Sequence, residues 1–225
     1  MKKLFGYLLE LGLLLSLSVS SFGQSLAAPS AEFHPQITVR VYNRVRMPPD
    51  RLAQAEQVAT QILRKAGVQT VWLDCTVATG QWQPACDGPL GPTDFLLQFV
   101  EEIQSLSPQT SEHTLGFAVL PDNGLQADRA YISYHRTHDS ASRCQVSLGL
   151  VLGVASAHEI GHMLMGSGEH SRSGLMKAQV GPKDMQRAER SDLLFTDGQV
   201  KQVRLAVLAR IAQYNVPQVE STVPR

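Results

Sequence analysis

Residues 146–162 read VSLGLVLGVASAHEIGH, an apolar run that ends in two histidines and a glutamate. Such a run predicts a helix buried at the centre of a domain, because it has no polar face to turn toward water. Polar side chains at the end of a buried helix are costly unless they are paired or bind a metal ion. His158 and His162 lie on one helical face, since they are four residues apart. The pattern therefore predicts a zinc site, with Glu159 beside the metal as the base for a bound water.

The residues after this helix supply candidates for a third ligand. A catalytic zinc site uses three protein ligands and leaves one position for water. Gly166 allows the chain to turn back, which would bring His170 to the two helical histidines. We therefore expect these three histidines to hold one zinc ion per chain. Glu169 is the nearest alternative ligand, and Glu189 from a later helix is a weaker one.

Glycines interrupt the apolar run at positions 149, 153 and 161. Each glycine costs a helix about 1 kcal/mol relative to alanine. Gly149 and Gly153 are four residues apart and share one helical face. We expect another element to approach the helix closely along this face.

The zinc pattern and the residues after it resemble those of the metzincin zinc peptidases, most closely the matrixin branch. The shared features are His-Glu-Ile-Gly-His at 158–162, Gly166, His170 followed by serine, and Gly-Leu-Met at 174–176. The usual metzincin spacing is HExxHxxGxxH, whereas this chain has one residue more before the glycine and one more before the third histidine. The resemblance implies that Met176 lies in a Met-turn, a hydrophobic floor under the ligands.

The chain as a whole also resembles a group of small secreted, matrixin-like bacterial proteins. The segments that carry this likeness are 71–75, 91–94 and 134–135, together with the extended zinc motif. The match runs from about Ile37 to Tyr214. It implies a fold and a zinc site, and very little about the substrate.

The N-terminal residues have the pattern of a signal peptide. Two lysines precede Leu4–Val19, an apolar run with a single charged residue. Cleavage after Gly23, or as late as Ala27, would leave residues 24–225 as a single metalloprotease-like domain. We therefore expect a secreted or periplasmic protein. An uncleaved anchor is the alternative, although the run is shorter than the ~20 residues that span a bilayer, and no other segment predicts a span in the mature chain.

The composition argues against a nucleic-acid partner. The formal net charge is zero, 18% of the residues are charged and 6% are aromatic. A nucleic-acid-binding surface would need a basic stripe or a set of stacking aromatic side chains. We therefore expect no nucleic-acid partner, and the zinc motif leads us to expect a peptide or protein substrate.

Three cysteines would remain after export. Cys75 and Cys86 flank a polar loop, and a disulfide between them would contribute about 3 kcal/mol by constraining the unfolded chain. Cys144 is interpreted as a small buried side chain near the start of the zinc helix, and not as a nucleophile.

Hydrophobic periodicity predicts the remaining elements. The predicted strands are Ile37–Tyr42, Val68–Leu73, Asp94–Val100, Leu115–Leu120 and Arg129–His135. A helix from Pro48 to Ala66 joins the first two strands, which makes them a parallel pair. Its buried stripe is expected to be Leu52, Ala55, Val58, Ala59, Ile62 and Leu63.

The last predicted helix begins at a capping-box pattern over Thr196–Gln199. Its expected apolar face is Val200, Val203, Leu205, Val207, Leu208 and Ile211. Together the elements predict an α+β fold in metzincin-like order: a mixed sheet of about five strands, a first helix, a central zinc-binding helix, a Met-turn and a C-terminal helix.

The favoured hypothesis is an exported zinc endopeptidase that hydrolyses peptide bonds with metal-activated water and Glu159 as the general base. An extended substrate would add to the sheet edge near Leu115–Leu120. One alternative is a non-catalytic secreted module of the same fold that binds zinc and peptides. Another is a zinc amidase that acts on cell-wall peptide stems.

Overall fold

The computed structural model describes residues 35–76, 83–106, 111, 113–122 and 126–214. The predicted signal peptide lies outside these residues. Of the described residues, only those of α4 (Leu148–Met165) form a helix long and apolar enough to cross a bilayer, and they lie buried inside the protein.

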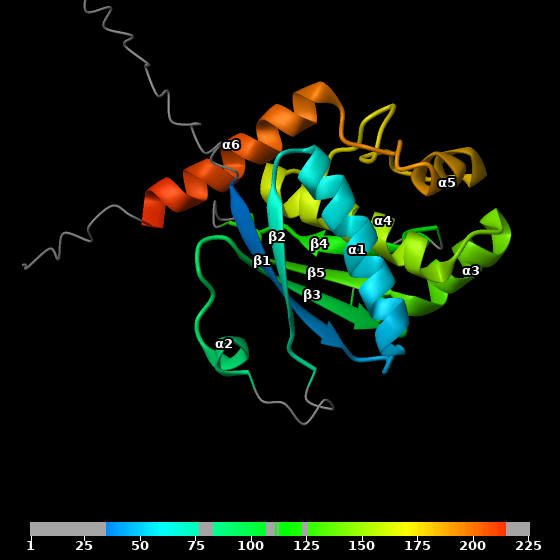
Figure 1. Cartoon of the computed structure of the whole chain (residues 1–225), viewed down its shortest axis with the longest axis horizontal. Helices are drawn as coiled ribbons and strands as arrows, with labels where there is room; N and C mark the ends of the chain where they lie inside the picture. Colours follow the sequence, from blue (N-terminus) through cyan, green and yellow to red (C-terminus); the bar gives the residue numbers. More distant parts are fainter. Residues whose placement is uncertain (1–34, 77–82, 107–110, 112, 123–125, 215–225) are drawn as a thin grey trace, which may run out of the picture. The chain divides into compact units, whose positions relative to one another are not determined.

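A five-stranded mixed sheet forms the frame of the fold (Figure 1). Its strands are β1 (Gln36–Asn43), β2 (Gln69–Asp74), β3 (Asp94–Val100), β4 (Gly116–Val119) and β5 (Arg129–Ser133). The spatial order is β2-β1-β3-β5-β4, with β4 antiparallel to β5 and the other pairs parallel. The five predicted strands and the mixed sheet are confirmed. β4 lies at an edge of the sheet, where its outer main-chain groups have no strand partner among the described residues.

Helix α1 (Pro49–Lys65) joins β1 to β2 and makes the predicted parallel pair. Proline suits the first turn of a helix because the N–H that it lacks would have no partner there. Five residues of the predicted stripe are buried, and Val58 packs against them partly buried. Gly67 follows the helix with φ of +77°, a conformation that glycine adopts without strain.

Helix α1 packs closely against α4 at the two glycines singled out in the sequence. A Cβ atom at Gly153 would lie 2.6 Å from the carbonyl oxygen of Ala55, and one at Gly149 would overlap the side chain of Gln54. The predicted close approach is confirmed, and the approaching element is α1.

Replacing Gly153 with alanine is expected to lower the free energy of unfolding by about 1–3 kcal/mol, since α1 must move away from α4. Urea denaturation at a fixed zinc concentration measures the change. Gly198→Ala is the matched control, because nothing lies within 4 Å of the Cβ it adds, and it should change stability by less than about 0.5 kcal/mol. A Gly153→Ala variant as stable as the parent would contradict the packing.

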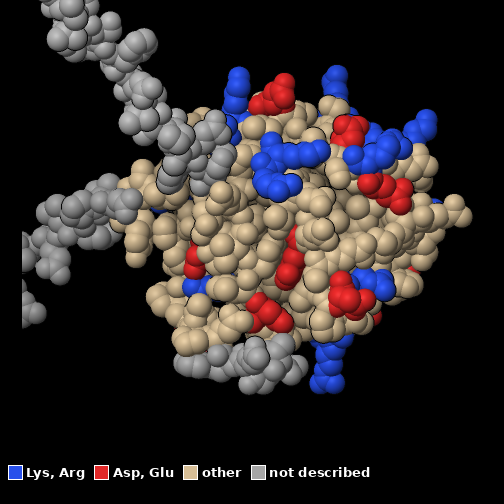
Figure 2. All heavy atoms as spheres, in the orientation of Figure 1, with Lys and Arg blue, Asp and Glu red and all other residues tan. Residues whose placement is uncertain are grey.

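Charged side chains of both signs are interspersed on the face of the molecule drawn in Figure 2. Uncharged surface separates the small groups of lysine, arginine, aspartate and glutamate on this face. This arrangement agrees with a formal net charge of zero.

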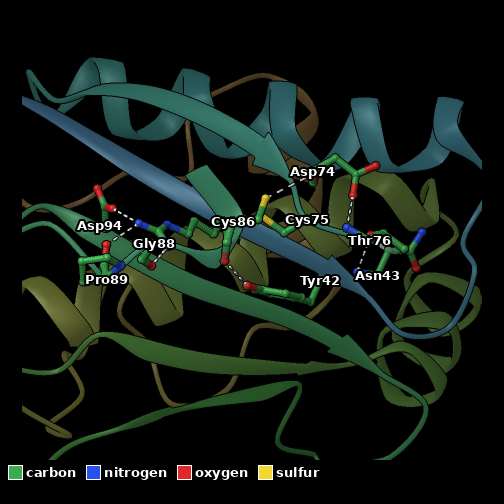
Figure 3. The surroundings of a disulfide bond; sticks show 10 residues. Tyr42, Asn43, Asp74, Cys75, Thr76, Cys86, Gly88, Pro89 and Asp94 are labelled. Carbon is green, nitrogen blue, oxygen red and sulfur yellow. Dashed lines mark hydrogen bonds and ion pairs between the residues drawn. A yellow bond between two sulfur atoms is a disulfide. The ribbon is translucent and has the colours of Figure 1, made fainter. Parts of the chain in front are cut away.

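The predicted disulfide joins Cys75 and Cys86, with their Cα atoms 5.5 Å apart (Figure 3). Cys86 lies in α2 (Pro84–Asp87), a short helix in the segment expected to be a loop. Arg40 of β1 holds the residues that follow, donating to the carbonyl oxygen of Gly88 at 2.7 Å and to the carboxylate of Asp94 at 2.7 Å. The disulfide and this arginine together hold residues 86–94 against the sheet.

The prediction of a strand through residue 135 is wrong at its end. β5 stops at Ser133, and α3 (Tyr134–Cys144) begins directly after it. The Ser133 hydroxyl accepts the N–H of Arg136 at 3.2 Å, an N-cap that starts the helix without a turn. Tyr134 and His135 therefore lie in the first turn of a helix. A further helix, α5 (Pro182–Glu189), was also not predicted.

The last helix is α6 (Asp197–Tyr214), and the predicted capping box is present: Thr196 donates its N–H to Gln199 Oε1 at 2.9 Å. The expected apolar face is wrong in part. Leu205 and Leu208 are 64% and 38% exposed, because the helical repeat turns them away from the buried side. The buried side of α6 instead includes Arg210, together with Val203 and Val207.

Candidate metal centre

Helix α4 positions two of the histidines and the glutamate. Its residues are buried from Leu148 to Leu164. The helix ends at Gly166, which has φ of 62° and donates its N–H to the carbonyl oxygen of His162 at 2.9 Å. This left-handed cap turns the chain back, as the sequence predicted.

The structure brings His158, His162 and His170 together. Their ligand atoms all lie within 4.8 Å of one another, and the Nε2 atoms of His158 and His162 are 3.0 Å apart. The first two rings are buried, whereas His170 is exposed on the loop after the helix. Among the described residues, the group of metal-ligating type comprises these three, without Glu169 or Glu189. The two extra residues of the motif do not prevent the convergence.

Hydrogen bonds fix which nitrogen of each buried ring carries a proton. His158 Nδ1 contacts the carbonyl oxygen of Leu175 at 2.9 Å, and His162 Nδ1 contacts that of Ser167 at 2.6 Å. A carbonyl oxygen only accepts, so both Nδ1 atoms are donors. In neutral rings the two Nε2 lone pairs then face each other.

These facing lone pairs need a cation between them. A proton is disfavoured, because burial lowers the pKa of His158 to about 3, with the nearby His162 adding to the effect. Burial also lowers the pKa of His162. Neutral imidazoles whose Nδ1–H groups are held by carbonyls are the form in which histidine binds zinc. The donor set therefore fits a zinc ion.

Glu159 lies between α4 and the edge strand. Its side chain is buried, and burial raises its pKa to about 8, although a hydrogen bond from the backbone of Ala118 in β4 acts in the opposite direction. Gly116 leaves the space for it, since a Cβ atom there would lie 3.1 Å from Glu159 Cγ and 2.6 Å from the carbonyl oxygen of Tyr131. The carboxyl group is thus held next to the first ligand and beside the edge strand.

Met176 forms a floor against α4. It is fully buried, and a Cβ atom at Gly161 would lie 2.8 Å from its sulfur. The turn that carries it is closed by the N–H of Ser171, which donates to the carbonyl oxygen of Met176 at 2.8 Å. Glycine at 161, between the two helical histidines, therefore allows the turn to pack directly beneath them.

A cavity of about 650 Å³ runs past the three histidines and Glu159. One wall is β4 with the residues that precede it, and the other is the segment 177–182. Ser133 donates its N–H to the carbonyl oxygen of Leu115 at 2.9 Å, so Leu115 faces β5. In an antiparallel ladder the direction alternates, and the main-chain groups of Gly116 and Ala118 therefore point away from the sheet.

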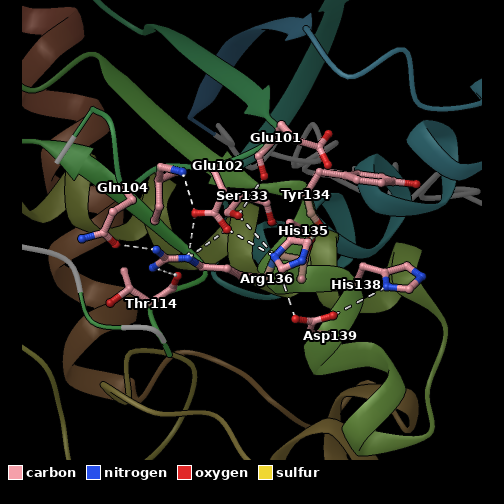
Figure 4. Close-up of polar contacts among 12 residues, drawn as sticks. Glu101, Glu102, Gln104, Thr114, Ser133, Tyr134, His135, Arg136, His138 and Asp139 are labelled. Atoms are coloured by element: carbon pink, nitrogen blue, oxygen red, sulfur yellow. Dashed lines mark hydrogen bonds and ion pairs between the residues drawn. The ribbon is translucent and has the colours of Figure 1, made fainter. Parts of the chain in front are cut away.

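Arg136 holds the segment that leads into the edge strand (Figure 4). Its side chain is largely buried, and it donates to the carboxylate of Glu102 at 3.1 Å and to the carbonyl oxygen of Ser111 at 2.6 Å. It also donates to the carbonyl oxygen of Thr114, two residues before β4. His135 contacts the same carboxylate of Glu102 at 3.3 Å, but its ring is exposed and does not line the cavity. Sequence reasoning missed Arg136, and the only signal for it was the serine N-cap three residues earlier.

An ion pair shapes the opposite wall. Lys177 donates to Asp184 at 2.6 Å, and the same carboxylate accepts the N–H of Gly181 at 3.2 Å. Burial alone would raise the pKa of Asp184, but the bonds from Lys177 and Gly181 hold it below its ordinary value. The segment 177–182 is thereby tied to the start of α5.

No protein-family model and no curated protein matches the chain. Among solved structures, it is similar to an archaemetzincin from Methanopyrus kandleri, with 16% sequence identity and a TM-score of 0.48 over 77% of this chain and 97% of that chain. It is also similar to a zinc-dependent peptidase from Methanocorpusculum labreanum, with 13% identity and a TM-score of 0.48 over 73% of this chain and 99% of that chain. The matrixin branch stays a prediction from the sequence.

Proposed function

We propose that this chain is a zinc-dependent endopeptidase that acts outside the cytoplasm. One observation carries the proposal: His158, His162 and His170 converge on one point beside the buried carboxyl group of Glu159, in a cavity bordered by a sheet edge. The three histidines would hold one zinc ion per chain.

A zinc ion held by the three histidines would supply a Lewis acid, which would acidify a bound water and polarise a peptide carbonyl group. Glu159 accepts the proton of the attacking water and delivers it to the leaving nitrogen. Burial of Glu159 favours its neutral form, which suits the second step, and the positive charge of a zinc ion beside it would favour the carboxylate that the first step needs. The carbonyl groups of Leu175 and Ser167 keep both helical rings oriented with Nε2 toward the centre.

The edge strand β4 would bind the substrate. The N–H of Ala118 is bonded to Glu159, but the outward main-chain groups of Gly116 and the carbonyl oxygen of Ala118 can pair with an extended peptide, which then lies across the histidines. Residues at both ends of the strand, His113 before it and Leu120 after it, line the cavity. A peptide can therefore run past the site in both directions, as cleavage of internal bonds requires.

Two features support export. The apolar run Leu4–Val19 follows two lysines, and a disulfide joins Cys75 and Cys86. Disulfides persist mainly in oxidising compartments. N-terminal sequencing of the protein recovered outside the cytoplasm should begin at or near residue 24. Recovery of only the full-length chain in the membrane fraction would favour the uncleaved anchor.

Hydrolysis that depends on zinc is the direct test. The purified mature chain with one equivalent of zinc is expected to cleave internal bonds in a mixed library of quenched peptides. A phenanthroline chelator should reduce the rate by at least ~10²-fold, because the Lewis acid is lost, and added zinc should restore it. The non-chelating isomer is the control. Zinc bound at one per chain without cleavage across the library would favour a non-catalytic module that binds zinc and peptides.

A further inference from the structure

We propose that the part of the cavity next to α3, called the α3 arm, binds a carboxylate of the substrate through Arg143 and Ser140. The inference rests on the proposed peptidase function and names the substrate class. It concerns residues of α3 that the metal centre does not use.

Three residues of α3 line the cavity: Ser140, Arg143 and Cys144. Their spacing of three and four places them on one helical face. Val154 and Ala155 of α4 line the same cavity, one helical turn before the first histidine ligand. One turn advances a helix by about 5 Å. The α3 arm therefore begins within reach of the residue next to the cleaved bond.

The polar groups of the arm have no partners in the described part of the protein. Arg143 is exposed and forms no ion pair there. Ser140 is 3% exposed, and its hydroxyl makes no hydrogen bond to the described residues. By contrast, Lys177, which also lines the cavity, is paired with Asp184 at 2.6 Å. The Ser140 hydroxyl oxygen keeps some contact with solvent in the cavity, so it is free to bind a ligand oxygen there.

The arm lies at the start of the edge strand. His113 and Thr114 line the cavity, and Arg136 in the first turn of α3 donates to the carbonyl oxygen of Thr114. Antiparallel pairing is the more stable arrangement of two strands. A peptide paired antiparallel to β4 directs its carboxyl-terminal side toward the start of β4. The α3 arm then receives the residue that follows the cleaved bond.

The chemistry of these groups selects a carboxylate. A guanidinium binds a carboxylate through two parallel hydrogen bonds, and the Ser140 hydroxyl can donate a third. Val154 and Ala155 offer an apolar wall for the methylene groups of a glutamate side chain. The carboxylate can come from an acidic side chain or from a peptide that ends at this position.

Paired substrates test the proposal. Two quenched peptides differ only in glutamate or glutamine at the residue after the cleaved bond. The parent enzyme is expected to show about tenfold higher kcat/KM for the glutamate peptide, the effect of a charge-assisted hydrogen bond. Arg143→Gln should bring this ratio to about one, Arg143→Lys should retain part of it, and Ser140→Ala should lower it. Arg64→Gln is the matched control, an exposed arginine outside the cavity that should keep the parent ratio.

Two further measurements distinguish a side-chain carboxylate from a terminal one, and distinguish failure of this proposal from failure of the peptidase proposal. Glutamine peptides that end at this residue as a free acid or as an amide show whether a terminal carboxylate also binds. Fluorescence anisotropy with the zinc-loaded Glu159→Gln variant measures the binding of the same peptides without hydrolysis. If the variant binds carboxylate peptides selectively and the parent cleaves none of the peptides, the carboxylate site is supported and the peptidase function is rejected. If the protein cleaves or binds all the peptides equally well, the carboxylate site in the α3 arm is rejected and the peptidase function is not. If it neither binds nor cleaves any of them, both proposals are rejected.

A structural role for Arg143 predicts a different result. A cation in the last turn of a helix stabilises it, and Arg143 is the basic residue of that turn in α3. If this were its only role, the Arg143 variants would lower the melting temperature and leave the glutamate-to-glutamine ratio unchanged. That outcome would overturn the proposal.

Discussion

Replacing Glu159 with glutamine is expected to reduce kcat/KM for peptide hydrolysis by at least ~10³-fold and to leave the zinc content unchanged. Glutamine has nearly the same size, and its Oε1 can accept the hydrogen bond that Ala118 now makes to the carboxyl group. The fold around the centre is therefore retained. What is lost is a group that can take a proton from water, since an amide does not do so near neutral pH. Hydrolysis of a quenched peptide and metal analysis of the same sample measure the two quantities.

Glu169→Gln is the matched control for this experiment. It makes the same chemical change on an exposed residue next to His170 and outside the convergent group. Its kcat/KM should stay within about twofold of the parent value. Equal turnover by the Glu159→Gln variant would reject Glu159 as the general base. Loss of zinc from that variant would instead show that Glu159 coordinates the metal.

Local patterns were sufficient to predict the core of this fold. The apolar run before His158 predicted a buried helix, and Gly149 and Gly153 predicted the close contact that α1 makes with it. Both predictions depend on residues a few positions apart, which share one face of a helix whatever the rest of the chain does. The convergence of His170 with the helical histidines has the same origin, because a glycine cap turns the chain back immediately.

Helix α3 was not predicted because it lacks an apolar stripe. Its buried residues are Arg136, Thr137, Ser140 and Ala141, and only the last is hydrophobic. Periodicity of hydrophobic residues does not detect such a helix. It begins at a serine N-cap directly after a strand, so no glycine or proline marks the change. The sequence therefore did not predict that residues of α3 line the cavity.

Buried arginines were missed for a related reason. Arg210 is 6% exposed and donates to the carbonyl oxygens of Ala127 and Met163, which joins α6 to the end of α4. Burial lowers its pKa, and the charge of Asp128 acts in the opposite direction. A charged residue in a sequence is normally assigned to the surface. Only the three-dimensional arrangement shows which carbonyl groups are left for it to bind.

Replacing His170 with alanine is expected to weaken zinc binding by about 10²–10⁴-fold. Structural zinc sites bind with about 10–16 kcal/mol, and one of three ligands accounts for about 3–5 kcal/mol of such a total. The two helical histidines remain in place, because Leu175 and Ser167 hold their rings. Competition with a zinc indicator of known affinity measures the dissociation constant. The melting temperature, which zinc should raise in the parent, should respond less in the variant.

Glu169→Ala and His138→Ala distinguish the possible outcomes. Glu169 is the alternative third ligand, and His138 is an exposed histidine of α3 outside the cavity. Both variants should bind zinc as the parent does if His170 is the ligand. Should Glu169→Ala lose zinc while His170→Ala retains it, the site would have two histidines and one carboxylate. That result would require the loop after Gly166 to place Glu169, and not the exposed His170 ring, against the buried pair.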